Sequence, residues 1–257
     1  MTMIEKTAVV SSKASIGENV KIAHNAVIYD DVIIGDNCEI GPNAVLYNGA
    51  RLGNNVKIFQ GASVSNDPQD LKFSGEPTEF RIGDNSVIRE FATLHRGTDA
   101  HGYSQIGKDC LIMAYAHVAH DCILGNNVIL ANSVQIGGHV EIEDWVIVGG
   151  SVPIHQFVKI GQHTMIGGGW RVPYDVPPYM IAAQEPLKYT GVNLVGLRRR
   201  GFSNEQITKI KEAYKTLFHS GKNLGEAKAE LAEKSGSDDV VGVILDFLGR
   251  ITRPGIK

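Results

Sequence analysis

Residues 124–148 read LGNNVILANSVQIGGHVEIEDWVIV, and an aliphatic residue returns at every sixth position of this stretch. Continuing the same step in both directions, an aliphatic residue stands at 26 of the 29 positions from residue 4 to residue 172. The exceptions, which fall in two stretches that we interpret as loops (65–81 and 95–105), are Asp70, Glu76 and Ala100. Because the register resumes after each loop, each loop takes the place of whole six-residue units.

A period of six matches neither the 3.6-residue period of an α-helix nor the two-residue alternation of a strand. It is the signature of a parallel β-helix, in which three hexads form one triangular coil and coils stack about 4.8 Å apart. A second position, four residues after the aliphatic one, holds Ala, Val or Cys in most hexads, which fits a tight inner corner. Gly and Asn beside the aliphatic residues suit turns with positive φ. The fold class is therefore mainly β, with a β-helix over residues 1–189.

The hexad pattern stops near residue 190, where helical patterns begin. In GFSNEQITKIKEAYKTLFHSGK (201–222), Ser203 and Gln206 have the spacing of a capping box, and Gly221 is a stop signal. Two more helices are expected in LGEAKAELAEK (224–234) and DDVVGVILDFLGRI (238–251). We therefore predict a small α-helical domain at 190–257 that closes the end of the prism.

Composition narrows the class of protein. The formal net charge of −3 gives no basic excess that would indicate a nucleic-acid partner. No apolar run approaches the roughly 18 residues of a membrane span, and the N-terminus lacks a signal-peptide pattern, so a cytoplasmic protein is expected. The three cysteines form no CxxC and each occupies the small inner-corner position, so packing is their expected role.

Histidines give the first indication of chemistry. Four of the nine take nearly the same position within an 18-residue coil and should line one edge: His117, His120, His139 and His155. By the same arithmetic His24, His95 and His163 lie elsewhere, and His219 lies on a helix. Imidazoles supply bases and hydrogen-bond donors near neutral pH. A zinc site built from several of them at a subunit junction is the alternative.

The best local arrangement is HVAHDC at residues 117–122. With Val118 and Cys122 inward, His120 and Asp121 should project outward near a turn. Asp121 would then orient the His120 imidazole, as in a base–orienter pair, or make only an Asx-type turn contact. No Gly-x-Ser-x-Gly offers a serine nucleophile. The basic run 198–200 is either a solvated turn or a clamp for phosphates or an acidic partner.

Seven longer strings add a family resemblance: NDPQDLKFSGEPTEFRIGD (66–84), HRGT (95–98), AHVAHDC (116–122), GGHVEI (137–142), HQFVKIGQH (155–163), DVPPYMIA (175–182) and GVNLVGLRRRGFS (191–203). In these strings and their order the chain resembles the bacterial UDP-N-acetylglucosamine O-acyltransferases of lipid A biosynthesis. The resemblance implies a homotrimer of left-handed β-helices. It also implies transfer of a 3-hydroxyacyl chain from acyl carrier protein to the sugar 3-hydroxyl of UDP-N-acetylglucosamine, without a cofactor, a metal or a covalent intermediate.

The resemblance also assigns roles to residues. His120 would be the general base, Asp121 its orienting group, and Gly138 the backbone N–H donor to the oxyanion. Gly168 would set the acyl length, although the neighbouring Trp170 is bulky, and Val195 replaces a polar residue common among relatives. Contacts with the nucleotide sugar or the acyl donor would come from Asp70, Lys72, His117, His139, His155, Gln156, Asn193, Arg199 and Arg200.

Three functional interpretations remain. The first is this O-acyltransferase. The second is a related enzyme on the same fold, either a sugar N-acyltransferase or a zinc-dependent hydratase. The third is a structural β-helix without catalysis, which the hexads alone would permit but the histidine edge disfavours. GVNLVGLRRRGF and the loop with Asp70 and Lys72 favour the first.

Overall fold

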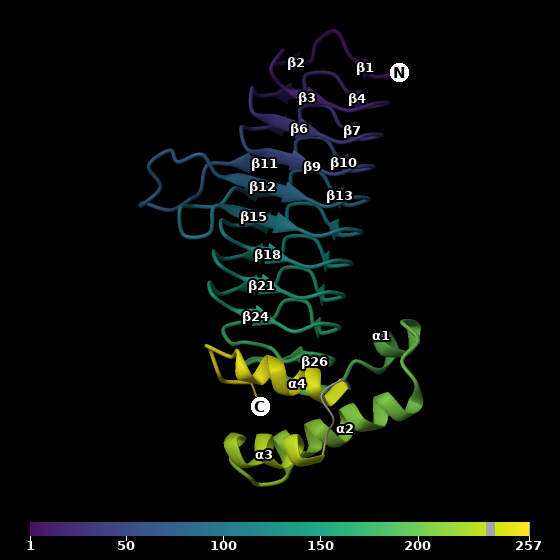
Figure 1. Ribbon diagram of the computed structural model, residues 1–257, viewed down its shortest axis with the longest axis vertical. Helices are drawn as coiled ribbons and strands as arrows, with labels where there is room; N and C mark the ends of the chain where they lie inside the picture. Colours follow the sequence, from purple (N-terminus) through teal and green to yellow (C-terminus); the bar gives the residue numbers. More distant parts are fainter. Residues whose placement is uncertain (235–239, 257) are drawn as a thin grey trace.

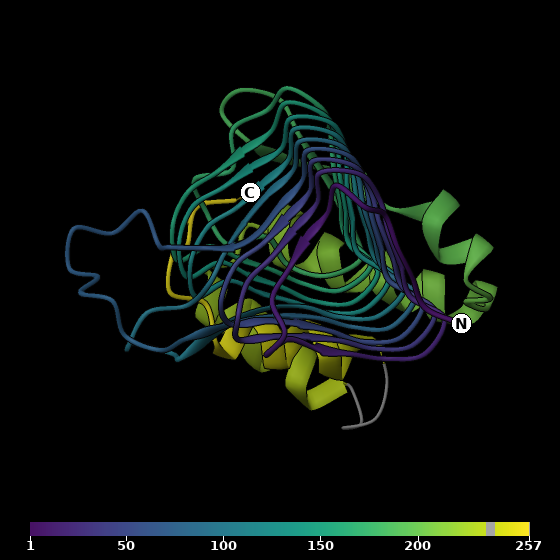
Figure 2. The same cartoon turned by 90° about the horizontal axis from the view of Figure 1, so that it is seen from above.

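The computed structural model describes residues 1–234 and 240–256, and they form a triangular prism with helices at one end (Figure 1). Seen from above, the stacked coils outline a triangle with one sheet on each side, parallel throughout except for the last two strands of one sheet (Figure 2). In most hexads the aliphatic residue ends a short strand and points inward, and Ile40, Leu46 and Leu124 are at most 2% exposed. The hexad interpretation is therefore confirmed.

We name the three sheets A, B and C. Sheet A contains β1 (Met3–Ile4), β4 (Lys21–Ile22), β7 (Glu39–Ile40), β10 (Lys57–Ile58), β13 (Val87–Ile88), β16 (Leu111–Ile112), β19 (Ile129–Leu130), β22 (Ile147–Val148), β25 (Met165–Ile166), β26 (Met180–Ala183) and β27 (Lys188–Val192). Sheet B contains β2 (Val9–Val10), β5 (Val27–Ile28), β8 (Val45–Leu46), β11 (Ser63–Asn66), β14 (Thr93–His95), β17 (His117–Val118), β20 (Gln135–Ile136) and β23 (Pro153–Ile154). Sheet C contains β3 (Ser15–Ile16), β6 (Val32–Ile34), β9 (Ala50–Leu52), β12 (Glu79–Ile82), β15 (Tyr103–Ile106), β18 (Ile123–Leu124), β21 (Glu141–Ile142) and β24 (Lys159–Ile160).

The strand register shows how the two loops fit into the stack. Most paired residues are 18 apart, as in Lys21 and Glu39. Lys57 pairs with Val87, 30 residues on, and Val87 pairs with Leu111, 24 residues on. These two coils therefore carry 12 and 6 additional residues, which are whole hexads as expected. The longer loop projects far from the prism (Figure 2).

Each corner of the prism is a short turn with one residue in the left-handed region. We call the corners A–B, B–C and C–A after the sheets they join. Asn127, Ser133 and His139 hold this position at successive corners, with φ of 57°, 60° and 61°. The glycine that follows many aliphatic residues was expected to adopt a positive φ, but Gly35 does not, and glycine is needed there for a different reason. A Cβ on Gly35 would lie 2.5 Å from the carbonyl oxygen of Gly53, so glycine is needed where coils approach closely.

Within the described part of the chain, four helices follow β27: α1 (Leu194–Arg199), α2 (Asn204–His219), α3 (Leu224–Lys234) and α4 (Val240–Gly249). The capping box of α2 forms as expected, with Ser203 and Gln206 bonded to each other's backbone N–H. Positions 238 and 239 of the last expected helix lie outside the described residues. The sequence pattern missed α1, which is only six residues long and is capped by Asn193.

The helices pack against the last coils (Figure 1). The hydroxyl of Tyr214 on α2 donates to the Pro178 carbonyl. Beyond α4 the chain returns to the prism, where the buried Asp175 carboxylate accepts from the N–H groups of Lys159, Thr252 and Arg253 at 2.7–2.8 Å. A single carboxylate thus fastens the C-terminal segment to the end of the β-helix.

The expected packing role of the cysteines agrees with their burial. All three thiols are free and buried. Burial raises the pKa of Cys110 to about 11 and that of Cys122 to about 12, so neither thiol is ionised near neutral pH.

Candidate functional site

The centre of the candidate site is a histidine–aspartate pair at the B–C corner, just after β17. Asp121 holds the left-handed turn position, with φ of 58°, and its Oδ2 lies 2.8 Å from Nδ1 of His120. The expectation that both side chains project outward is wrong for Asp121, whose side chain is 0% exposed. The reason is the loop 95–105, where the N–H and the Oγ1 hydroxyl of Thr98 donate to the carboxylate at 2.9 and 2.8 Å.

These hydrogen bonds determine whether Asp121 is charged. Burial alone raises the pKa of Asp121, but donation from His120 and Thr98 outweighs it and leaves the pKa below its ordinary value. Asp121 is therefore a carboxylate near neutral pH. Because a carboxylate only accepts hydrogen bonds, a neutral His120 carries its hydrogen on Nδ1 and leaves the Nε2 lone pair as a base.

Gly138 occupies the equivalent position one coil further on. Its N–H has no acceptor among the described residues, so it is a donor available to a ligand. A Cβ at this position would lie 2.7 Å from Cε1 and 2.8 Å from Nε2 of His120. Glycine is therefore required for the imidazole to lie beside the free N–H.

His139 and His117 surround this pair. The His139 ring meets His120 edge to face, with centroids 5.1 Å apart. Burial lowers the pKa of His139, and the opposing effects of Asp121 and Asp70 do not restore it. Burial, with His95 and His120 nearby, lowers the pKa of His117 to about 4. Both rings are therefore neutral near pH 7 and can donate or accept hydrogen bonds.

His95 was placed elsewhere by the sequence arithmetic, and this was wrong. Its ring meets His117 edge to face at 4.9 Å, and its Nδ1 lies 2.7 Å from the Asp67 carbonyl oxygen. The arithmetic failed because the two loops add residues to their coils, so positions before and after a loop do not share one remainder. Thr98 was also missed, although the quoted HRGT motif contained it. Both residues could have been placed only with the strand pairing across the two loops, which the sequence does not give.

His120, Asp121 and His139 also have a spacing compatible with a metal ion, since one ligand atom from each lies within 4.8 Å of the others. However, the Asp121 oxygens already accept from His120 and from two donors of Thr98. A metal would have to displace at least one of these bonds. The donor set therefore fits a base with its orienting carboxylate better than a zinc centre.

A groove of about 1040 Å³ runs from this corner along sheet C to α4. The candidate pair lies at one end, and the helical domain forms the other end. Residues that line it include His101, Tyr103, Asp121, His139, Val243 and Arg250. The groove therefore connects the neighbourhood of Asp121 with the helical end of the chain.

The remaining expected site residues do not gather around this pair in one chain. His155 and Gln156 lie one coil beyond Gly138, both exposed, with His155 Nδ1 2.9 Å from the Gln156 carbonyl oxygen. Lys72 is exposed on the projecting loop, where its N–H bonds to the Asp70 carboxylate at 3.0 Å. Asp70 itself is half-buried and acts on His139 only through its charge.

The basic run belongs to α1 instead of a solvated turn. Arg198 and Arg199 lie in its last turn, where cations are favoured by the helix dipole. Arg199 is exposed, whereas the guanidinium of Arg200 lies 5.2 Å above the Trp145 ring. Asn193 is buried, and its side chain accepts from Gly196 N–H and donates to the His163 carbonyl. In this chain its amide therefore has a capping role.

Gly168 lies at the A–B corner, across sheet B from the pair. The atoms nearest to a Cβ built on it are backbone atoms of Gly149 and Gly150, at 3.3–3.9 Å. The Trp170 ring lies instead against Gly167, where a Cβ would meet it at 3.1 Å. Trp170 therefore leaves the outer face of Gly168 uncovered.

Comparison with known proteins shows which family has this fold and these motifs. Residues 175–256 match a family model described as UDP N-acetylglucosamine O-acyltransferase, domain 2, and residues 13–48, 31–66 and 103–138 match bacterial transferase hexapeptide repeats. A UDP-N-acetylglucosamine acyltransferase from Bacteroides fragilis is 43% identical, with a TM-score of 0.97 over 99% of this chain and 100% of that one. The chain belongs to the UDP-N-acetylglucosamine O-acyltransferase family.

Other members of this family match equally completely. The enzyme from Acinetobacter baumannii is 38% identical, with a TM-score of 0.96 over 99% of this chain and 100% of that one. An Arabidopsis member is 32% identical, with a TM-score of 0.83 over 99% of both chains. Family membership confirms two expectations: the fold is a left-handed β-helix, and the protein is an acyltransferase. Among the described residues, none of the helices combines the length and apolar character needed to span a bilayer.

Proposed function

We propose that the chain transfers a 3-hydroxyacyl group from acyl carrier protein to the 3-hydroxyl of UDP-N-acetylglucosamine, as the first step of lipid A biosynthesis in the cytoplasm. The observation that carries the proposal is the His120–Asp121 pair beside the free Gly138 N–H. A sugar hydroxyl needs a base to become a nucleophile, and a thioester carbonyl needs a donor for its developing charge. Both groups lie at one corner, within a family of acyltransferases.

The reaction needs no covalent intermediate. Nε2 of His120 takes the proton of the sugar hydroxyl as the oxygen attacks the thioester carbon. The Gly138 N–H donates to the oxyanion that forms on the former carbonyl oxygen. When the carbon–sulfur bond breaks, the His120 imidazolium returns its proton to the thiolate of the carrier. Asp121 remains a carboxylate throughout and stabilises the imidazolium.

The remaining candidate residues would bind the two substrates. The sugar and acyl donor would contact Asp70, Lys72, His117, His139, His155 and Gln156. Arg199 and Arg200, with Asn193 as the cap of α1, would receive the diphosphate or nucleotide. The carbon chain would extend toward Gly168.

We propose a homotrimer as the active unit. The His120–Asp121 pair lies at the B–C corner, whereas Gly168 lies at the A–B corner and Arg200 contacts Trp145 at the C–A corner, so a neighbouring chain would have to complete each site. Leu71, at the tip of the projecting loop, is 107% exposed in the single chain, which suits a side chain that contacts a second copy. Sedimentation should give a trimer, and a fully active monomer would contradict this assembly.

The decisive assay offers UDP-N-acetylglucosamine with 3-hydroxyacyl carrier proteins of increasing chain length. His120→Ala should lower turnover by at least about 10², because a positioned base contributes 10²–10⁴-fold. His24→Ala is the matched control, since that imidazole is exposed near the N-terminal end. No ester product with any donor, or a fully active His120→Ala protein, would refute the proposal.

A further inference from the structure

The segment HRGT, residues 95–98, lies between two parts of the site. On one side is the projecting loop with Asp70 and Lys72, and on the other is the Asp121 carboxylate. Neither the base mechanism nor the substrate assignments above give this segment a role. Residues 95–98 contact both the projecting loop and Asp121.

Arg96 holds the loop. Its guanidinium pairs with Asp67 at 2.7 Å, donates to the Asn48 carbonyl at 3.0 Å, and lies 5.2 Å from the Phe73 ring centre. The Arg96 N–H also donates to the Asn66 carbonyl at 3.0 Å. The Arg96 side chain is only 13% exposed, whereas its partner Asp67 is 72% exposed, so the guanidinium is held at the protein surface by several contacts at once.

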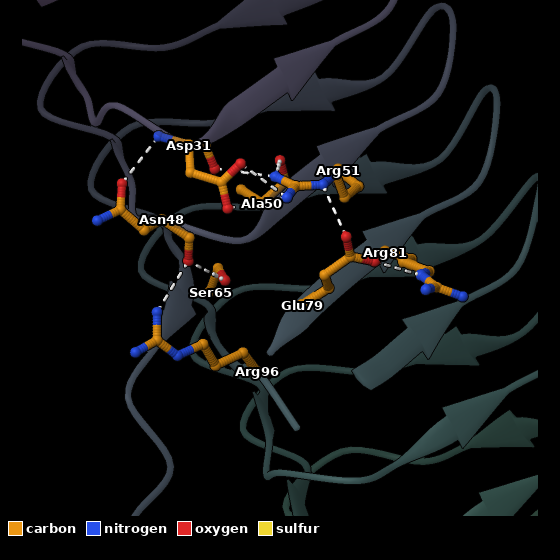
Figure 3. Close-up of polar contacts among 8 residues, drawn as sticks. All are labelled: Asp31, Asn48, Ala50, Arg51, Ser65, Glu79, Arg81 and Arg96. Carbon is orange, nitrogen blue, oxygen red and sulfur yellow. Dashed lines mark hydrogen bonds and ion pairs between the residues drawn. The ribbon is translucent and has the colours of Figure 1, made fainter. Parts of the chain in front are cut away.

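The base of the loop is fixed at both ends (Figure 3). Where the loop begins, the Ser65 hydroxyl donates to the Asn48 carbonyl that Arg96 also contacts. Where it ends, Glu79 pairs with Arg51 at 3.0 Å, and Arg51 in turn pairs with Asp31 at 2.8 Å. Both ends of the loop are therefore bonded to the coils that precede it.

The other end of the segment reaches the catalytic pair. The Gly97 carbonyl accepts from the Thr78 hydroxyl at 2.5 Å, and a Cβ on Gly97 would collide with the Tyr103 backbone at 2.5 Å. Thr98 Oγ1 accepts from the Ala100 N–H at 3.2 Å and donates to Asp121 at 2.8 Å. Because Ala100 can only donate, the hydroxyl hydrogen of Thr98 is left for Asp121.

We propose that residues 95–98 form a brace that couples the substrate loop to the His120–Asp121 pair, with Thr98 as the positioning residue for Asp121 and Arg96 as the residue that holds the loop. This inference rests on the proposed function for its kinetic readouts. The brace transmits loop position to the carboxylate through four consecutive residues. A loosened loop therefore alters the hydrogen bond that orients the base.

The Thr98 end is tested with an isosteric pair of variants. Thr98→Val removes the hydroxyl and keeps the shape, and it should lower kcat about tenfold while KM for the nucleotide sugar changes less than about twofold. Thr98→Ser keeps the hydroxyl and should restore kcat. In ¹⁵N-histidine NMR of the protein alone, Thr98→Val should shift the His120 Nδ1–H signal and Thr98→Ser should not.

The Arg96 end is tested with Arg96→Met and, as control, Arg81→Met. Arg81 pairs with Glu79 in the same network, but its side chain is 47% exposed. Arg96→Met should raise KM for UDP-N-acetylglucosamine about tenfold, because losing a charge-assisted contact weakens binding by about a factor of ten. It should also shift the His120 Nδ1–H signal. Arg81→Met should do neither. If Arg96→Met melts at a clearly lower temperature than the wild type, Arg96→Gln replaces it, because glutamine also lacks the charge that pairs with Asp67.

The outcomes separate the brace from the function. Wild-type kcat and an unmoved His120 signal in Thr98→Val overturn the brace, whatever reaction the protein catalyses. An unmoved signal in a folded Arg96 variant overturns the coupling. A fully active His120→Ala protein overturns the proposed function instead, and the NMR shifts still report on the brace.

Discussion

The imidazole of His120 lies against the backbone of Gly138, so closely that a Cβ at position 138 would come within 2.7 Å of its Cε1 atom. The base and the free N–H are thus adjacent only because residue 138 has no side chain. This contact joins two consecutive coils, and it makes the site sensitive to a single methyl group.

Gly138→Ala should therefore lower turnover strongly while the protein stays folded. The added methyl group would push the imidazole away from the N–H, and we expect a loss of at least about tenfold in kcat. Circular dichroism and thermal unfolding should match the wild type. Gly249→Ala is the control, because a Cβ there meets nothing within 4 Å. Unchanged kcat in Gly138→Ala would show that the contact does not matter to the reaction.

Gly168→Met should shift the preferred acyl donor to shorter chains. Each buried methylene is worth about 0.8 kcal/mol, so four lost methylenes cost about 3 kcal/mol, or on the order of 200-fold. The wild type should prefer a donor of about 14 carbons or longer, because each further buried methylene strengthens binding by the same increment. Gly150→Met, one coil nearer the candidate pair, should select donors that are shorter still. Competition between mixed acyl carrier proteins measures both, and an unchanged length profile or a wild-type optimum near 10 carbons contradicts the assignment.

Removing metal should leave turnover intact. Asp121 is already bonded to Thr98 and His120, so no metal is needed to organise the pair. Dialysis against EDTA followed by elemental analysis should give active protein with far less than one zinc per chain. Loss of activity that zinc alone restores would favour the hydratase interpretation.

The free energy of unfolding should decrease as the pH falls below about 6.5. Burial, reinforced by Arg200 and opposed by Asp144, lowers the pKa of His163 to about 4, and burial also lowers that of His117 to about 4. An unfolded histidine titrates near 6.5. Between these values the unfolded chain binds more protons than the folded one, so this stability is full above about pH 6.5 and is lost toward pH 4. Urea unfolding at pH 5 and pH 8 measures the difference.

His163→Phe isolates one of these histidines. The ring lies stacked between Trp145 and Tyr179, and its buried Nδ1 has no partner among the described residues. Phenylalanine preserves the stack and removes the titrating group. The variant should lose less stability than the wild type between pH 8 and pH 5, by on the order of 1–3 kcal/mol. An identical pH dependence would show that His163 does not contribute.

Asp175→Ala should release the C-terminal segment. The substitution leaves the N–H groups of Lys159, Thr252 and Arg253 without their acceptor, and each unsatisfied donor costs about 1–3 kcal/mol when it remains buried. Limited proteolysis should cut near the C-terminus sooner than in the wild type. Asp175→Asn retains one acceptor oxygen and should fall between the two. Equal protease resistance of all three proteins would exclude this anchor.

Most of the fold could be predicted from the sequence because one physical rule repeats. An aliphatic residue must enter the prism once per side, and this rule fixes both the register and the lengths of the two larger coils. Helix α1 escaped because six residues are too few for periodicity to show. Its cap, Asn193, was noticed only as a possible ligand.

The candidate site could be predicted only where its residues are neighbours in sequence. His120 and Asp121 are adjacent, so their pairing was expected and found. The cover that Thr98 places on Asp121 depends on how the loop 95–105 folds back, and no period in the sequence describes that path. His95 was assigned to the wrong edge for the same reason.

The stacking of coils has a consequence for how disorder spreads through the molecule. Each coil bonds mainly to the coil before and the coil after it, so cooperativity is one-dimensional and opening should propagate from an end. No coil precedes the first one, and its inward residue Ile4 remains 46% exposed. His117 lies on β17, the sixth strand of its sheet, and the helices protect the opposite end. Opening that starts at the N-terminal end must therefore pass five strands of sheet B before it reaches β17 and the candidate pair.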